Sequence, residues 1–217
     1  EDKKNLNPPT AYGQNRLKLE EFVAKNFDNH LIVRLPSLFG KELKKNFLYD
    51  ILNPIPTFLT SKNYHIFVEK INKNLMSDIY DFNKKLSVFF LNKKKLLETG
   101  YKEKIEIILH KNNLSSYSFF SKKSQFQFYN LKNLSNDLDL CMQNELNLIH
   151  LVTEPLIAGD IYKSIKQQKM PNVENKIHLE NVHTNYSKIW NGKDNYIQNS
   201  DKVLEEIIKF SKLQSLK

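Results

Sequence analysis

The chain has 217 residues, of which 40% are hydrophobic and 12% aromatic, so it can bury a core and is not a disordered segment. Two of its 33 basic residues, Arg16 and Arg34, are arginines, and the net charge is +9. Because nucleic-acid readers rely on arginine, this composition favours a solvated lysine surface over a nucleic-acid interface. No apolar run is long enough to span a membrane, and the single cysteine, Cys141, excludes an internal disulfide. We therefore expect a cytoplasmic protein without a membrane or nucleic-acid partner.

The first predicted element is a helix over residues 11–27. Pro8-Pro9 disfavours helix before it, and Thr10 suits the N-cap. Four apolar residues fall at helical spacing on one stripe: Leu19, Phe22, Val23 and Phe27.

A short strand and a turn follow this helix. The run from His30 to Leu35 is apolar apart from Arg34, which is typical of a buried parallel strand. Pro36 stops the strand, residues 37–40 read as a tight loop, and residues 46–52 predict a short helix.

Lysine and asparagine dominate residues 54–123, between small apolar clusters. We interpret this segment as a small mixed α/β lobe inserted into the main fold. Within it, residues 104–110 fit either a helix or a strand.

Strands and helices alternate again in the last third of the chain. Strands are predicted at residues 126–129 and 146–152, and helices at 131–140, 157–165 and 200–213, the last capped by Ser200. Residues 181–190 look irregular. Strands separated by helices indicate an α/β fold with parallel pairing. We expect three regions: a core segment 1–53, the lobe 54–123, and a segment 124–217 with the last core strand and a substrate-side region.

The sequence carries no phosphate-binding loop, no glycine-rich dinucleotide turn, and no histidine or cysteine cluster with metal-ligand spacing, so we predict no metal site. The six histidines are scattered, and His30, His110 and His150 lie in or beside apolar runs, which is typical of structural residues.

One pair of residues has catalytic potential. Tyr12 and Arg16 are four apart, so a helix places them one turn from each other. A fixed cation beside a phenol favours the phenolate, which can exchange a proton with a substrate hydroxyl or carbonyl. The same spacing also suits a surface cation–π contact, and the spacing alone leaves both interpretations open.

The surrounding motif, residues 7–20 (NPPTAYGQNRLKLE), resembles the active-site helix of extended short-chain dehydrogenases/reductases, the NAD-dependent sugar-nucleotide epimerase/dehydratase family. The following strand and loop, residues 33–40 (VRLPSLFG), are also similar to that family. The resemblance is strong over residues 7–53, looser over 124–167, and absent from 54–123. It implies the C-terminal part of a doubly wound, Rossmann-like parallel sheet with a small substrate lobe.

Two departures accompany this resemblance. Arg16 stands where the family has its catalytic lysine, and arginine is not interchangeable with lysine. The family's N-terminal half, which carries the glycine-rich turn, has no counterpart in these residues. We therefore expect a fragment of a longer protein, inactive by itself.

The resemblance implies roles for individual residues. Tyr12 would be the acid/base, and Arg16 would bind the nicotinamide ribose of NAD or NADP. The loop residues Leu35, Pro36, Ser37 and Leu38 would line the nicotinamide, although Pro36 and Gly40 also fit a purely structural turn. The residues expected to contact a nucleotide-sugar or related substrate are Lys45, Asn46 and Phe47.

The leading hypothesis is therefore an NAD(P)-dependent oxidoreductase, epimerase or dehydratase of a nucleotide-linked or related sugar. Two alternatives stay open. Arg16 in place of lysine also fits a non-catalytic relative with a cofactor-sensing or assembly role, and the positive charge leaves a basic nucleic-acid-binding module as a weaker third. A homodimer also stays open.

Overall fold

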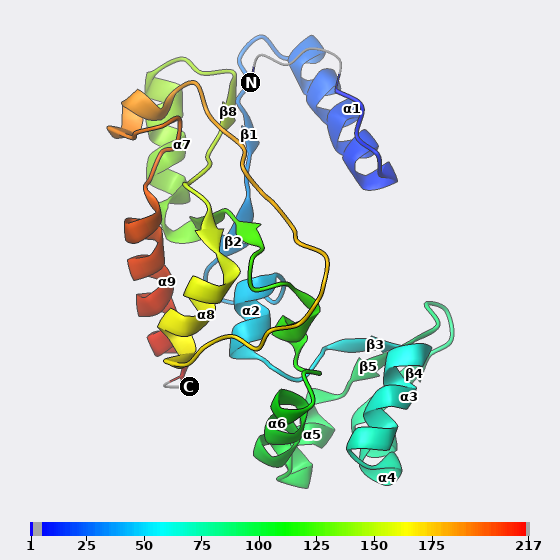
Figure 1. Ribbon diagram of the computed structural model, residues 1–217. Coiled ribbons are helices and arrows are strands. Elements are labelled where there is room, and N and C mark those ends of the chain that lie inside the picture. The colour runs from blue at the N-terminus through cyan, green and yellow to red at the C-terminus, as the bar shows by residue number, and fades with distance from the viewer. Residues whose placement is uncertain (2–5, 216–217) are drawn as a thin grey trace. The chain divides into compact units, whose positions relative to one another are not determined.

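The computed structural model describes residue 1 and residues 6–215 and shows a mixed α/β protein with short parallel and antiparallel sheets (Figure 1). The expected α/β class is confirmed at this level. The chain divides into two compact units. The first comprises Glu1–Leu43, Gln125–Leu156 and Leu179–Lys217, and the second comprises Lys44–Ser124 and Ile157–His178.

Two parallel strand pairs join distant segments in the first unit (Figure 1). Strand β1 (Ile32–Arg34) pairs with β8 (Leu148–His150), and β2 (Ser37–Phe39) pairs with β7 (Phe128–Asn130). The short strands β6 (Gln125–Phe126) and β9 (Leu156–Ile157) lie where the chain passes from one unit to the other. The parallel direction expected for residues 30–35 and 146–152 is thus confirmed.

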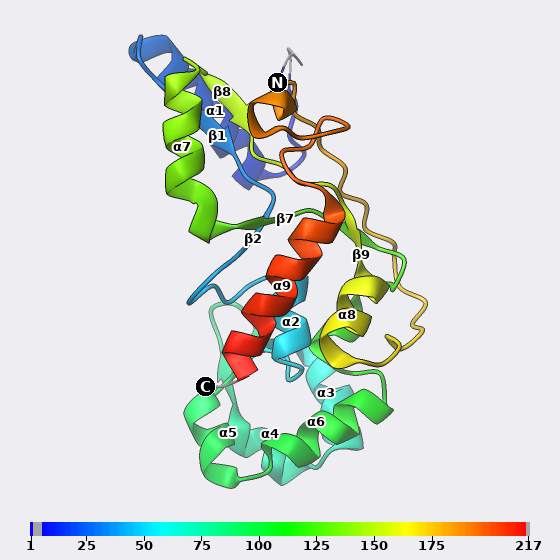
Figure 2. The ribbon, with the colours of Figure 1, turned by 90° about the vertical axis from the view of Figure 1, so that its left-hand side faces the viewer.

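Three α-helices complete the described part of the first unit: α1 (Ala11–Asn26), α7 (Leu134–Gln143) and α9 (Ser200–Ser215). Helix α9 runs beside β7 (Figure 2). The Phe210 ring meets the Phe39 ring edge-on, with 5.7 Å between the ring centres. Single 3-10 turns span Leu131–Asn133 and Ser187–Trp190. A buried apolar cluster stabilises the strand pairs and contains Tyr129, Cys141, Ile149, Leu151 and Ile197.

Two local expectations are wrong. Residues 37–39 form strand β2 rather than a loop, because their backbone pairs with β7 after Pro36. The last helix is capped by Asn199 rather than Ser200, since Asn199 Oδ1 accepts a hydrogen bond from the Lys202 amide at 3.0 Å. Both residue types make good caps, so the sequence alone could not choose between neighbours.

The second unit combines helices with one antiparallel sheet of strand order β3-β5-β4 (Figure 1). Its strands are β3 (Phe58–Thr60), β4 (Tyr80–Asn83) and β5 (Val88–Leu91). Its helices are α2 (Phe47–Leu52), α3 (Ser61–Lys70), α4 (Lys73–Ile79), α5 (Lys93–Thr99), α6 (Lys102–Lys111), α8 (Ala158–Lys166) and a 3-10 turn, Ser116–Phe119. Residues 104–110 are therefore helical. The unit has its own apolar core: Ile55, Leu59, Phe67, Met76, Ile79, Tyr80, Leu96, Ile105 and Leu109.

Candidate functional site

Helix α1 begins where the sequence predicts and brings Tyr12 and Arg16 into contact. The Thr10 hydroxyl accepts a hydrogen bond from the Gly13 amide at 3.1 Å, which caps the helix. One turn into the helix, Arg16 Nε donates to the Tyr12 hydroxyl at 3.2 Å, and the guanidinium carbon lies 5.3 Å from the ring centre. The Tyr12 side chain is 71% exposed, so a ligand could reach its hydroxyl directly from solvent.

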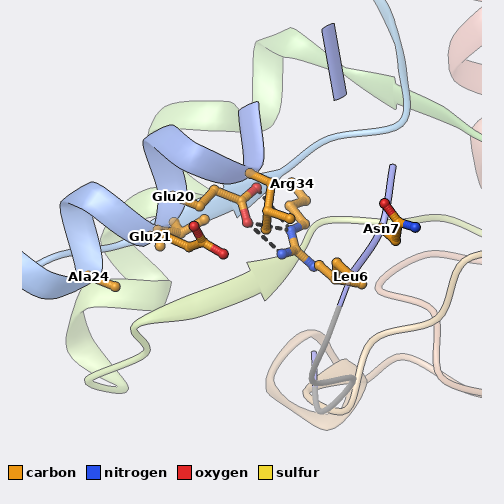
Figure 3. A pocket seen from close by; sticks show the side chains of 8 residues that line it. Leu6, Asn7, Glu20, Glu21, Ala24 and Arg34 are labelled. Atoms are coloured by element: carbon orange, nitrogen blue, oxygen red, sulfur yellow. Dashed lines mark hydrogen bonds and ion pairs between the residues drawn. The ribbon is translucent and has the colours of Figure 1, made fainter. Parts of the chain in front are cut away.

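A second arginine ties α1 to strand β1. Arg34 Nε donates to the two carboxylate oxygens of Glu20 at 3.0 and 3.1 Å, and Arg34 Nη2 donates to Glu20 Oε2 at 2.5 Å (Figure 3). The hydrogen bonds to Glu20 raise the pKa of Arg34. Such a two-pronged arrangement fixes both groups in one plane and is among the stronger ion-pair geometries. Arg34 therefore connects the helix of Tyr12 with strand β1, which leads into residues 35–37.

His150 lies on the other side of the Arg34 guanidinium. Arg34 Nη1 is 3.1 Å from His150 Nε2, and His150 Nδ1 is 3.0 Å from the His183 carbonyl oxygen. A guanidinium only donates and a carbonyl only accepts, so Nε2 accepts and Nδ1 carries the proton. Burial lowers the pKa of His150, and the neighbouring positive charge of Arg34 acts in the same direction. The ring is thus held as a neutral tautomer with both nitrogens engaged, which makes it a structural histidine rather than a general base.

A hollow of about 600 Å³ opens beside this arginine. Its lining includes Leu35, Pro36 and Ser37, three of the four residues predicted to face the nicotinamide. The fourth, Leu38, packs against the apolar cluster of the first unit. The remaining lining residues are Arg34, Gln127, His150, Val152, Glu180 and Val182. Apolar walls with a few convergent polar groups are typical of small-molecule sites.

Gln127 holds one wall of this hollow in place, and nothing in the sequence pattern singles this residue out. Its Nε2 donates to the carbonyl oxygens of Thr153 at 2.6 Å and Val182 at 2.8 Å, while its Oε1 accepts from the Val182 amide at 2.7 Å. Its backbone amide donates to Glu180 Oε2 at 3.0 Å. A glutamine between Phe126 and Phe128 looks like the outward-facing residue of an alternating strand. It is fully buried because the 179–182 segment covers that face.

The Glu1 carboxylate lies in a cluster of donors next to His150. It accepts hydrogen bonds from the His150 amide, the Thr184 hydroxyl and the Asn185 amide, each at 2.8 Å, and its side chain is 4% exposed. Burial pushes the pKa of Glu1 upward, but these hydrogen bonds outweigh burial and hold the pKa below its ordinary value. Glu1 therefore lies against β8 as a charged, fully bonded carboxylate.

The predicted substrate residues belong to the second unit. Asn46 caps α2, since its Oδ1 accepts from the Tyr49 amide at 3.2 Å. Phe47 is buried, with its ring edge-on to Phe120 at 5.4 Å, and Lys45 is exposed. Asn46 and Phe47 thus have clear roles in the local fold, and a substrate contact by these three residues stays a prediction.

Within residue 1 and residues 6–215, no helix is long and apolar enough to cross a bilayer, and no three acidic, histidine or cysteine side chains gather in a way that could hold a metal ion. No protein-family model, curated protein or solved structure matches this chain.

Proposed function

We propose that the protein is an NAD(P)-dependent oxidoreductase, epimerase or dehydratase that acts on a nucleotide-linked or related sugar. One arrangement supports this proposal. The Tyr12–Arg16 contact lies on a helix that Arg34 ties to β1, and the loop after β1 lines a hollow of about 600 Å³. This arrangement combines an exposed phenol, a neighbouring guanidinium and a cavity within one compact unit.

The residues around the hollow fit a nicotinamide ring. Leu35, Pro36, Val152 and Val182 offer apolar walls, and Ser37 supplies a polar group at the rim. Bound NAD or NADP supplies the hydride chemistry. Tyr12 would take or give the proton at the substrate's hydroxyl or carbonyl oxygen, and Arg16 would donate hydrogen bonds to the Tyr12 oxygen and to ribose hydroxyls.

Turnover tests the assignment of Tyr12. With the protein made from its complete reading frame, NAD(P) reduction or oxidation is measured spectroscopically over a panel of nucleotide sugars. Tyr12→Phe keeps the ring and removes the hydroxyl, so turnover falls by about 10²–10⁴ if Tyr12 is the acid/base. Arg16→Lys keeps the cation and retains part of the activity. Normal turnover of Tyr12→Phe in an active protein would contradict the proposal.

Tyr101→Phe is the matched control. Tyr101 is an exposed helix-cap tyrosine of the second unit, with Lys104 Nζ 5.7 Å from its ring centre. Its ring also faces a cation, and Tyr101 is not among the residues that line the hollow beside residues 35–37. We expect Tyr101→Phe to turn over like the unmodified protein.

A non-catalytic relative is the second candidate function. Arg16 stacks over an exposed Tyr12 ring at 5.3 Å, which is also the geometry of an ordinary surface cation–π contact. A protein of this kind would bind NAD(P) in a calorimetric titration of the complete polypeptide and turn over none of the sugars. Binding with turnover favours the enzyme, and binding without turnover favours this relative.

A further inference from the structure

Helix α1 has few contacts that could hold it in place. None of its residues is buried, and its apolar side chains Leu19 and Phe22 are 51% and 57% exposed. Isolated helices of this length are marginal in water, so packing or a specific tether must define the orientation of α1. The ion pair between Glu20 and Arg34 is such a tether, because it joins the helix to β1 through three hydrogen bonds.

A second contact, with His150, holds the Arg34 guanidinium in place. Its Nη1 contacts His150 Nε2, and His150 is fixed through Nδ1 to the His183 carbonyl oxygen and through its amide to the Glu1 carboxylate. The Arg34 and Glu20 side chains are 29% and 24% exposed, so water screens this pair less than a fully exposed one. The guanidinium therefore presents a defined plane to Glu20 rather than a freely rotating charge.

The tether connects the two halves of the candidate site. Tyr12, Arg16 and Glu20 follow one another at four-residue intervals along one side of α1. Arg34 directly precedes Leu35, Pro36 and Ser37 in the hollow's lining. A change in the Glu20–Arg34 geometry would therefore shift the Tyr12–Arg16 pair relative to the hollow.

We propose that Glu20 and Arg34 are positioning residues: their bidentate ion pair sets where helix α1, and with it Tyr12, lies relative to residues 35–37. The tethering of α1 stands on the contacts above, and its effect on turnover rests on the proposed function. A substitution that keeps the charge but loses the planar fork, Arg34→Lys, should loosen α1 almost as much as Arg34→Gln.

Glu21 provides the matched control. Glu21 neighbours Glu20 on α1, and both line a second hollow of about 550 Å³, which is distinct from the hollow beside residues 35–37. The ion pair and hydrogen bonds drawn in Figure 3 join Arg34 to Glu20. Glu21→Gln changes the net charge of the protein by the same amount as Glu20→Gln and leaves the tether intact. A general electrostatic effect would affect both variants, whereas a specific tether affects only Glu20→Gln.

Hydrogen exchange of peptides covering Ala11–Asn26 measures the tether in the 217-residue chain. We expect exchange about tenfold faster in Glu20→Gln, Arg34→Gln and Arg34→Lys, the size expected for losing hydrogen bonds between charged groups. The double variant Glu20→Gln/Arg34→Gln should exchange no faster than either single one, because both remove the same interaction. Three results would overturn the tether. The first is an additive increase of exchange in the double variant, and the second is an equal increase in Glu21→Gln. The third is exchange of α1 at the random-coil rate in the unmodified chain.

Turnover of the complete protein then tests positioning. In Glu20→Gln, which leaves the lining of the hollow of about 600 Å³ unchanged, we expect kcat to fall about tenfold or more because Tyr12 is misplaced. The KM for NAD(P) should rise by a smaller factor, because Arg16 moves with α1 while the residues that line the hollow stay in place. Faster exchange of α1 with normal kcat would overturn the positioning role. If Tyr12→Phe is also silent in an active protein, the proposed function fails instead, and the exchange result still decides whether the tether exists.

Discussion

At the scale of single residues, Asp50 is a carboxyl group in an unfavourable environment. It lies on α2, and burial raises its pKa to about 7. The folded protein therefore binds a proton at Asp50 under conditions where the unfolded chain, with an ordinary aspartate pKa near 4, has released it. Stability contributed at this position is present below about pH 4 and falls as the pH rises toward 7.

Replacing Asp50 with asparagine should remove this pH dependence. The two proteins differ least near pH 4, where the folded carboxyl is protonated and the unfolded one has only begun to lose its proton. At pH 8 we expect Asp50→Asn to be more stable by about 2–4 kcal/mol, from ~1.4 kcal/mol per pKa unit. Urea unfolding followed by circular dichroism at pH 4, 6 and 8 measures the difference.

Asp78→Asn serves as the control, because Asp78 is an exposed aspartate on α4 of the same unit. Its stability should differ little from that of the unmodified chain at each pH. A stability difference for Asp50→Asn that stays constant from pH 4 to pH 8 would contradict the raised pKa.

Contacts between residues close in sequence could be predicted at the candidate site, and contacts between distant segments could not. The Tyr12–Arg16 contact follows from four-residue spacing on a helix, a local property that the sequence displays directly. Glu20 and Arg34 are 14 residues apart, so their ion pair depends on how the chain turns between α1 and β1. The burial of Gln127 depends on a segment 55 residues away, which alternation along its own strand cannot reveal.

At the scale of elements, helices were easier to predict than strands. The predicted helices at 11–27, 46–52, 157–165 and 200–213 agree with α1, α2, α8 and α9 to within about two residues, the usual uncertainty of helix ends. The strands are only two to four residues long, which is too short for a period of two to emerge clearly. Strand β2 forms because β7 pairs with it, and nothing in residues 37–40 reveals that partner.

One turn of the first unit depends on a glycine. The Gly192 amide donates to the Ser187 carbonyl at 2.9 Å and closes the 3-10 turn that carries Trp190. A Cβ atom at residue 192 would lie 2.0 Å from the carbonyl oxygen of Tyr196, which is backbone and cannot rotate away. Gly192→Ala should therefore destabilise the first unit by about 3 kcal/mol or more, as severe overpacking does.

Trp190 reports this change, because it is the only tryptophan and its indole N–H donates to Asp137 Oδ1 at 2.8 Å. Denaturant unfolding followed by Trp190 fluorescence gives the stability of the first unit. Gly100→Ala is the comparison: Gly100 has φ of 68°, but a Cβ atom added there would meet nothing within 4 Å. That variant should cost about 1 kcal/mol from backbone strain alone and leave the Trp190 transition unchanged. Equal transitions for both variants would contradict the steric argument.

At the scale of the whole molecule, the two units have separate apolar cores built from interleaved segments. The chain leaves the first unit at Leu43, returns at Gln125, leaves again at Leu156 and returns at Leu179. Helix α8 belongs to the second unit, where the Gly159 amide bonds to the Lys122 carbonyl at 3.0 Å. Hydrophobic periodicity identifies a helix but carries no information about the unit in which it packs. The sequence therefore indicated the α/β class and the order of elements, and the grouping of segments came only from the structure.

The apolar stripe formed by α1 and its C-cap residue Phe27 is exposed, although its spacing is that of a buried face. Leu19, Phe22 and Phe27 have the spacing of a buried helix face, yet they are 51–57% exposed. Exposed apolar stripes of this kind promote association, while a net charge of +9 opposes it. Added salt screens the repulsion and leaves the apolar attraction in place.

We therefore expect the 217-residue chain to associate with itself, more strongly at 0.5 M than at 0.05 M NaCl. Covering one phenylalanine stabilises a contact by about 1.5–3 kcal/mol, so Phe22→Glu should weaken association about tenfold or more. Leu97→Glu is the control, since Leu97 is 68% exposed on α5 of the second unit and introduces the same charge away from α1. Sedimentation velocity across a hundredfold concentration range measures the effect. A monomer at every concentration and salt would contradict the expectation. An equal change of association in both variants would also contradict it, because the α1 stripe would then not be the contact surface.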